Sequence, residues 1–381
     1  MLLSQGLLNE NQLQTILAAQ AATPAGQVRK RLGSLVIELG MATEKQVAEA
    51  LAEALALPLV DLGRTLLVPG HVPRRCRLSR AEHTAAVALS RRRALGVLGL
   101  LGAGGAGMVE LIRSTAGPAP RPKVAVGTTR LVEQYAAGAR QLGEWWVPPG
   151  SGSGPLPTVV LVHGGYWRAS YDRHLEDAVA ADLAGAGHLV WNLEYAASDA
   201  PWPATLTDVA AGYDFLMRGR YAKRVDPARL AVVGHSAGGH LALFLASRGR
   251  LPAGAPGAGP HQAPALVIPQ APVAALALGS KEGLGGGAVD ALLGGSPAKV
   301  PQRYAVADPV ALLPSGVRSV LVHGTADDVV PMSQSTTYRD AAVAAGDNCR
   351  LVQVQGGHFE HLDPTSGAWA AVRAALTTLP P

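Results

Sequence analysis

From about Val124 onward, the 381-residue sequence predicts an α/β fold in which helices cover both faces of a mostly parallel sheet. Short apolar or β-branched runs alternate with stretches of helical periodicity, such as residues 206–217 and 237–246. The runs are apolar throughout rather than at every second position, which is typical of strands buried on both faces of a sheet. Six such runs occur, at residues 158–162, 189–193, 230–233, 265–268, 319–322 and 351–354.

The composition is that of a folded protein, because 48% of the residues are hydrophobic and only 16% are charged. The chain is longer than one typical domain, so we expect one large domain and a smaller one. The net charge of +5 is concentrated between residues 64 and 93, where eight arginines face one glutamate. Arginine runs are most often solvated surfaces, so we expect no nucleic-acid partner. Cys76 and Cys349 have neither metal-binding nor disulfide spacing, and we expect no metal and no cofactor.

The nucleophile is indicated by Gly-His-Ser-Ala-Gly at residues 234–238, which fits the pattern Gly-x-Ser-x-Gly. The motif follows the strand predicted at 230–233 and precedes an apolar helix. A serine in such a strand-to-helix turn has a crowded backbone, and glycines two residues before and after it relieve the crowding. This is the setting of the nucleophile in the α/β-hydrolase fold, so we predict that fold, with Ser236 as the nucleophile.

A serine hydroxyl needs a histidine to take its proton and a carboxylate to orient that histidine. In this fold the chain order is serine, acid, histidine. The strand at 319–322 leads to Asp327 and the strand at 351–354 leads to His358, so we predict a triad of Ser236, Asp327 and His358. Asp328 and His361 are the alternatives for the acid and the base.

Donors for the tetrahedral oxyanion are expected from two places. One is the backbone amide of Ala237, directly after the nucleophile. The other is the loop His-Gly-Gly-Tyr-Trp at residues 163–167, after the strand at 158–162. This loop resembles the oxyanion motif of the kynurenine formamidases and related esterases, and so do the stretches at 191–195 and 202–209. The resemblance implies oxyanion donors within Gly164, Gly165 and Tyr166.

We expect a cofactor-free serine hydrolase that cleaves a small carboxylic ester or an arylformamide through an acyl-enzyme. Trp167, Tyr171 and Trp202 are candidates for the substrate pocket, and the glycine-rich segment 279–304 is expected to form a flexible rim. One alternative is a serine peptidase of the prolyl-oligopeptidase type. Another is a docking or cyclic-dinucleotide-binding protein with an attached hydrolase domain.

Residues 1–90 contain an internal repeat, in which Gly6 and the helix after it recur 34 residues later at Gly40. Arg-Leu-Gly at 31–33, Gly40, the helix through Leu51 and Leu-Pro-Leu-Val-Asp-Leu at 57–62 resemble the N-terminal domain of type II secretion and pilus-assembly ATPases. The resemblance implies a small, mainly helical domain, and some members of that family bind cyclic di-GMP. The first repeat has no Arg-Leu-Gly of its own, which favours a protein-docking module.

Residues 91–123 are expected to be a basic, glycine-rich apolar segment and a linker before the catalytic domain at 124–381. The segment resembles a twin-arginine export signal, which belongs at an N-terminus. Two interpretations stay open. Either the natural start lies near Val87 and the protein is exported, or the segment completes the first domain of a cytoplasmic protein.

Overall fold

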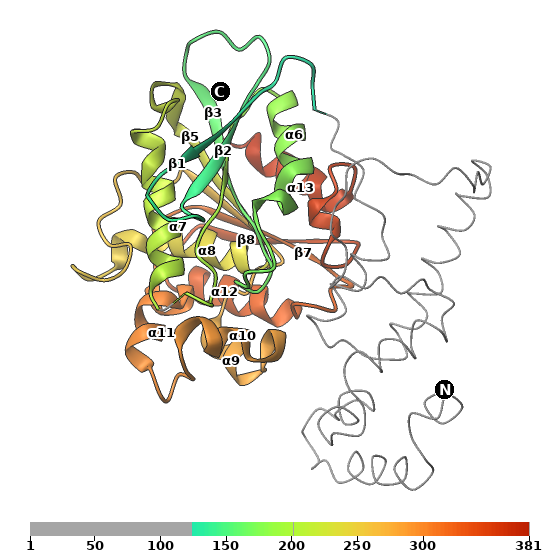
Figure 1. Ribbon diagram of the computed structural model, residues 1–381. Coiled ribbons are helices and arrows are strands. Elements are labelled where there is room, and N and C mark those ends of the chain that lie inside the picture. Colours follow the sequence, from blue (N-terminus) through green and yellow to red (C-terminus); the bar gives the residue numbers. More distant parts are fainter. Residues whose placement is uncertain (1–123, 201, 381) are drawn as a thin grey trace, which may run out of the picture. The chain divides into compact units, whose positions relative to one another are not determined.

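The computed structural model describes residues 124–200 and 202–380, which are built around an eight-stranded sheet (Figure 1). The strand order is β1-β2-β4-β3-β5-β6-β7-β8. Strand β2 is antiparallel to β1 and β4, whereas all neighbours from β4 to β8 are parallel. The strands are β1 (Thr129–Gln134), β2 (Leu142–Val147), β3 (Leu156–Val162), β4 (Leu189–Leu193), β5 (Val225–His235), β6 (Leu266–Gln270), β7 (Ser319–Gly324) and β8 (Cys349–Val354). This confirms the predicted fold class for the described part of the chain.

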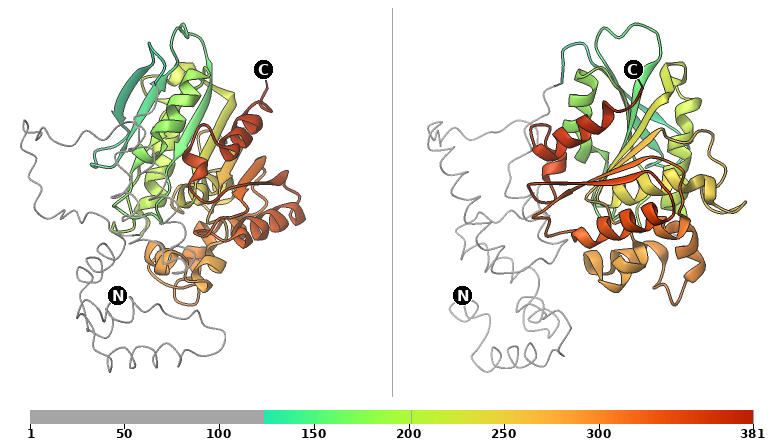
Figure 2. Two further views of the ribbon diagram at one scale, coloured as in Figure 1. Left: turned by 90° about the vertical axis from the view of Figure 1, so that its right-hand side faces the viewer. Right: turned by 180° about the vertical axis from the view of Figure 1, so that it is seen from behind.

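Helices cover both faces of this sheet, as Figures 1 and 2 show. Helices α6 (Asp177–Gly185) and α13 (Gly367–Leu376) pack on one face. Helices α7 (Ala204–Asp214), α8 (Ala237–Ser247) and α12 (Met332–Ala344) pack on the other. The connection from β6 to β7 contains α9 (Leu276–Lys281), α10 (Leu284–Leu293) and α11 (Pro301–Ala307). Short 3-10 helices are η1 (Arg173–Glu176), η2 (Phe215–Met217), η3 (Ala222–Arg224), η4 (Arg248–Arg250), η5 (Pro309–Leu312) and η6 (Glu360–Leu362).

The core is divided by the sheet into two layers, because successive side chains of a strand point to opposite faces. In β3, Val160 and Val162 enter the layer beneath α7 and α8, whereas Val159 and Leu161 enter the layer beneath α6 and α13. All eleven residues of α8 are buried, which explains why this helix is apolar on every side. The helix that follows the nucleophile therefore has little freedom to move.

The six apolar runs read from the sequence correspond to β3 through β8. Strands β1 and β2 were not predicted. The β6–β7 connection also differs from the flexible rim expected at 279–304, since much of it is helical. Leu284, Val289, Leu292 and Leu293 are buried at helical spacing, whereas Gly285 and its two following glycines have left-handed backbone angles and form a turn before the regular part of α10.

The predicted modules at 1–90 and 91–123, including the repeat, the secretion-ATPase resemblance and the export-signal resemblance, lie outside the described residues. Within 124–200 and 202–380, no helix has both the length and the apolar character needed to cross a bilayer.

Candidate active site

Ser236 occupies a strained turn between β5 and α8. Its backbone angles are φ 57° and ψ −116°, a combination that residues with a side chain rarely adopt, and it is only 2% exposed. A Cβ at Gly234 would overlap the carbonyl oxygen of Gly238, and a Cβ at Gly238 would overlap the carbonyl oxygen of Val162. Only glycine fits at these two positions, which is the physical reason for the Gly-x-Ser-x-Gly pattern.

Asp327 and His358 are brought together from the loops that follow β7 and β8. The Nδ1 atom of His358 lies 2.7 Å from Oδ2 of Asp327, and both side chains are buried. The other carboxylate oxygen accepts hydrogen bonds from the backbone N–H groups of Val329 (2.9 Å) and Val330 (2.8 Å). With Nδ1 donating to Asp327, the Nε2 atom of His358 keeps a lone pair that can accept a proton.

His323 is a further partner of Asp327 to which sequence reasoning gave no role. Its Nε2 atom lies 3.0 Å from the carbonyl oxygen of Val330 and 3.4 Å from Oδ2 of Asp327. Both partners are acceptors, so Nε2 carries the proton, while Nδ1 accepts from the Ser335 hydroxyl at 2.7 Å. The signal in the sequence is a histidine near the end of the strand that leads to the acid.

The pKa of Asp327 lies well below its ordinary value. Burial alone would raise the pKa of this carboxyl, but hydrogen bonds from His323 and His358, the positive charge of a protonated His358 and the backbone N–H of Val330 outweigh the burial. The carboxylate is therefore ionised across the neutral range, as an acid that stabilises an imidazolium must be.

His358 lies beside the nucleophile turn. Its backbone carbonyl oxygen accepts a hydrogen bond from Nε2 of His235, the residue before Ser236, at 2.9 Å. The two imidazole rings lie 4.5 Å apart. Burial, together with the neighbouring His358 and His361, lowers the pKa of His235 well below its ordinary value, so His235 is a neutral packing partner.

The two alternatives lie elsewhere. Asp328 is exposed, one residue beyond the buried carboxylate. His361 is fully buried, and burial followed by the proximity of His358 lowers its pKa to about 3. Neither Asp328 nor His361 takes part in the hydrogen bond between Asp327 and His358.

The glycine loop after β3 packs against the nucleophile. A Cβ at Gly164 would lie 2.9 Å from the carbonyl oxygen of His235 and 3.1 Å from Cβ of Ser236. Gly165, Tyr166 and Trp167 follow with positive φ values of 108°, 52° and 55°. No described residue accepts a hydrogen bond from the backbone N–H of Gly165 or Tyr166. The loop thus presents free N–H groups next to Ser236, and Ala237 adds the first amide of α8, which has no intrahelical acceptor.

The side chain of Tyr166 bridges two loops of the site. Its hydroxyl donates to the carbonyl oxygen of Val329 at 2.9 Å, which connects the glycine loop to the loop that carries Asp327. Burial, and secondarily the Asp327 charge, raise the pKa of Tyr166 to about 12, so the phenol stays protonated and remains a donor.

The three candidate pocket residues have different surroundings. Trp167 is 1% exposed and packs edge-on against His240 of α8, with ring centroids 5.3 Å apart. Tyr171 packs so closely against Gly165 that a Cβ there would overlap its ring. Trp202 is partly exposed, with the Arg303 guanidinium 5.5 Å from its ring. Within 124–200 and 202–380, no cluster of three metal-ligating side chains occurs.

The sheet order, the strained serine turn and the helices on both faces define an α/β-hydrolase. The chain belongs to the BD-FAE family, whose sequence profile matches residues 146–341.

Among individual proteins, the carboxylesterase NlhH of Mycobacterium tuberculosis is 36% identical over 104 residues, or 26% of this chain and 32% of the relative. The chain thus matches about a third of the length of this curated relative.

Solved structures share the fold at lower sequence identity. Esterase B from Lactobacillus rhamnosis is 19% identical with a TM-score of 0.60, covering 78% of this chain and 95% of that one. A truncated carbohydrate esterase from gut microbiota is 20% identical with a TM-score of 0.57, covering 67% and 98%. A butyrate-bound esterase from Thermogutta terrifontis is 21% identical with a TM-score of 0.51, covering 66% and 91%.

Proposed function

We propose that this protein hydrolyses small carboxylic esters through an acyl-enzyme formed on Ser236. The observation that carries the proposal is the buried Asp327–His358 pair beside a serine in a strained, glycine-flanked turn. A serine hydroxyl needs a base to become a nucleophile, and the Asp327–His358 pair supplies that base.

The reaction follows from the roles that the geometry supports. Nε2 of His358 takes the hydroxyl proton of Ser236 as Oγ attacks the ester carbonyl carbon. The negative charge that develops on the carbonyl oxygen is stabilised by the N–H groups of Gly165, Tyr166 and Ala237. The imidazolium then gives its proton to the departing alkoxide, which leaves an acyl ester on Ser236. Water, activated by the same histidine, releases the acid and restores the serine.

The substrate class is proposed as an ester rather than a formamide. The curated relative is a carboxylesterase, and its partial similarity supports an ester in this chain. An arylformamide is the second substrate to test, because the same chemistry cleaves a formyl group from an aromatic amine. Trp167 belongs to the glycine loop and Tyr171 packs on Gly165. With the partly exposed Trp202, these aromatic side chains are the candidates to accept a flat substrate of either kind.

Steady-state kinetics on 4-nitrophenyl acetate, 4-nitrophenyl butyrate and an N-formyl arylamine test the proposal. Ser236→Ala should abolish turnover, and a fluorophosphonate should add one covalent label to the wild-type protein and none to the variant. Ser247→Ala is the matched control, because this serine lies on the same buried helix and bonds only to the carbonyl oxygen of Leu243. Turnover that survives in Ser236→Ala would refute the mechanism, and faster release of the arylamine than of nitrophenol would move the substrate class to formamides.

A further inference from the structure

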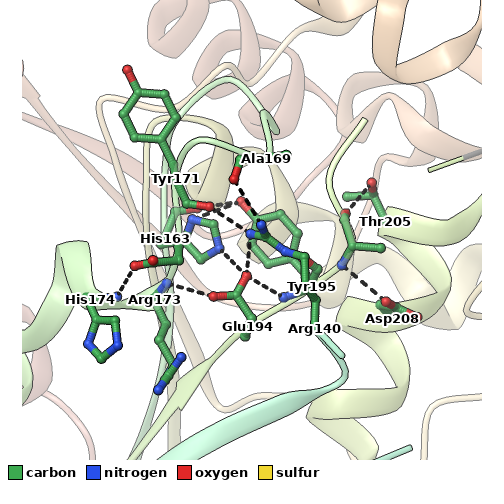
Figure 3. A network of polar contacts seen from close by, with 12 residues as sticks. Arg140, His163, Ala169, Tyr171, Arg173, His174, Glu194, Tyr195, Thr205 and Asp208 are labelled. Atoms are coloured by element: carbon green, nitrogen blue, oxygen red, sulfur yellow. Dashed lines mark hydrogen bonds and ion pairs between the residues drawn. The ribbon is translucent and has the colours of Figure 1, made fainter. Parts of the chain in front are cut away.

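A buried network of polar contacts lies behind the glycine loop, centred on Glu194 (Figure 3). Glu194 directly follows β4, and its side chain is 4% exposed. One carboxylate oxygen accepts from Nη2 of Arg140 (2.6 Å), Nε2 of His163 (3.2 Å) and the backbone N–H of Tyr195 (3.2 Å). The other accepts from the backbone N–H of Arg173 (2.9 Å). Four contacts from separate parts of the chain thus converge on this one carboxylate.

The Glu194 carboxyl is ionised. Burial alone would raise its pKa, but the hydrogen bond and charge of His163, the Arg173 backbone N–H and the charge of Arg140 together lower the pKa to about 2.

His163 faces acceptors with both ring nitrogens. Nδ1 lies 2.8 Å from the carbonyl oxygen of Gly164, and Nε2 lies 3.2 Å from the ionised Glu194. Nδ1 also lies 3.5 Å from the Tyr195 hydroxyl. The contact with Gly164 joins the ring to the glycine loop, and the contact with Glu194 fixes the orientation of the ring. Tyr195 stacks on this ring at 4.2 Å and 10°, and its hydroxyl donates to the carbonyl oxygen of His163 at 2.7 Å.

The hydrogen bond from His163 to Gly164 fixes the direction of an oxyanion donor. The Gly164–Gly165 peptide bond is trans, so its C=O and N–H point in opposite directions. With the carbonyl oxygen held by His163, the N–H of Gly165 points away from the network. Gly164 packs directly on Ser236, and that N–H has no acceptor among the described residues.

Arg140 connects the same network to the rest of the loop. Besides Glu194, its guanidinium donates to the carbonyl oxygens of Tyr195 (2.9 Å), Ala169 (3.1 Å) and Tyr171 (2.7 Å). Figure 3 shows these carbonyl groups converging on Arg140 from separate segments. The backbone that follows the glycine loop and the backbone that follows β4 are thereby held by one guanidinium, which is itself paired with Glu194.

We propose that Glu194 is a positioning residue for catalysis, which fixes the orientation of His163 and thereby aims the Gly165 N–H at the developing oxyanion. This inference rests on the proposed ester hydrolysis at Ser236. An N–H group aligned with the oxyanion acts more strongly in the transition state than on the bound ester, so its loss lowers kcat and leaves KM nearly unchanged.

Glu194→Gln tests the proposal because it keeps the shape of the side chain and removes the charge. We expect kcat to fall about 10- to 100-fold with KM within about threefold, less than the loss of an oxyanion donor itself. Affinity for a trifluoromethyl ketone, whose tetrahedral adduct places an oxyanion in the same position, should fall by a similar factor. Glu144→Gln is the matched control, since this buried glutamate of β2 is held by Arg130 through two hydrogen bonds of 2.9 Å. The substitution breaks a similar, partly buried ion pair, and Glu144 does not contact the glycine loop.

The two variants separate positioning from general destabilisation. If both lower the thermal midpoint but only Glu194→Gln lowers kcat and inhibitor affinity, the proposal holds. If Glu194→Gln keeps its kcat within about twofold, or loses no more than Glu144→Gln, the proposal is wrong.

Nitrogen-15 NMR follows the His163 ring directly. We expect its ring signals to shift in Glu194→Gln and to stay in place in Glu144→Gln, and unshifted signals in Glu194→Gln would overturn the proposal. Tyr195→Phe removes only the hydroxyl bond to the His163 carbonyl and should lower kcat by a few-fold. If Ser236→Ala shows that no ester hydrolysis depends on Ser236, the proposed function fails separately, and the NMR result still decides whether Glu194 positions His163.

Discussion

The substitution Asp327→Asn tests the centre of the proposed mechanism. The carboxylate faces four donors: the backbone N–H groups of Val329 and Val330, Nδ1 of His358 and Nε2 of His323. An amide has one oxygen, so it can accept from the pair on one side only, and its NH₂ group then faces the donors on the other side. Keeping the backbone contacts turns the NH₂ toward His358 and forces the imidazole into the tautomer that cannot take the Ser236 proton.

We expect this variant to lose about 10³- to 10⁴-fold in kcat, or about 4 to 5.5 kcal/mol of transition-state stabilisation. It should also be less stable by about 1–3 kcal/mol at neutral pH, because at least one buried donor is left without an acceptor. The pKa of Asp327 is depressed in the folded protein, so the carboxylate stabilises the fold above about pH 4, and this contribution is lost as the pH falls below that value. The stability difference between wild type and variant should therefore shrink in acid.

The assay is the hydrolysis of 4-nitrophenyl butyrate, combined with urea unfolding at neutral pH and in acid. Asp328→Asn is the control, because Asp328 is exposed and one residue away. It should change kcat by less than about twofold. The reasoning would be refuted if Asp327→Asn kept more than about one-hundredth of the wild-type kcat, or if Asp328→Asn lost as much.

Three further predictions concern the turn, a buried acid and the catalytic domain. Gly238→Ala places a Cβ on the carbonyl oxygen of Val162 and should lower stability by about 3 kcal/mol or more, whereas Gly249→Ala, with open space around it, should not; urea unfolding of both variants decides. Burial, and secondarily the charge of Asp177, raise the pKa of Glu176 to about 8. The neutral carboxyl therefore stabilises the fold below about pH 4, and that contribution is lost as the pH rises toward 8. Glu176→Gln should therefore raise the thermal midpoint by about a few °C near pH 8, by less near pH 5, and an equal rise at both values would contradict this. A chain that starts at Lys123 should keep its catalytic efficiency within a few-fold, and aggregation or a loss beyond about tenfold would show that the upstream residues are part of the enzyme.

The parallel part of the sheet could be predicted from the sequence because strands buried on both faces are apolar without interruption. Strand β4 is buried at all five positions, and the sequence segment that predicts it has the same bounds. Strand β1 lies at the edge, and its residues are exposed or only partly buried, so its sequence has no continuous apolar run. Strand β2 is buried over most of its length but contains a glycine and a glutamate, and its glutamate is accommodated by an arginine from β1. Such compensation between strands cannot be seen in one segment alone.

In the site, too, features that depend on neighbouring residues in the sequence could be predicted, whereas features that depend on distant residues could not. Ser236 could be predicted as the nucleophile because Gly-x-Ser-x-Gly after an apolar run is a local pattern, even though Gly238 is required by a contact with Val162 of β3. Asp327 and His358 could be chosen from chain order, and the structure places them in hydrogen-bond contact, while their catalytic role stays a prediction. The contributions of His323 and Glu194 could not be anticipated, because each acts through partners that only the folded chain brings near.

Val329 joins two parts of the site through its two backbone groups. Its N–H donates to Asp327, and its carbonyl oxygen accepts from the hydroxyl of Tyr166 on the glycine loop. A displacement of the glycine loop is therefore coupled to the Asp327 loop through one residue, Val329. An acyl group that displaces Tyr166 would disturb the alignment of the oxyanion donors and, through Val329, the support of the carboxylate behind the base. For a poorly fitting ester we therefore expect two losses, one in the stabilisation of the oxyanion and one in proton transfer by His358. Selectivity among esters should then appear in kcat more than in KM.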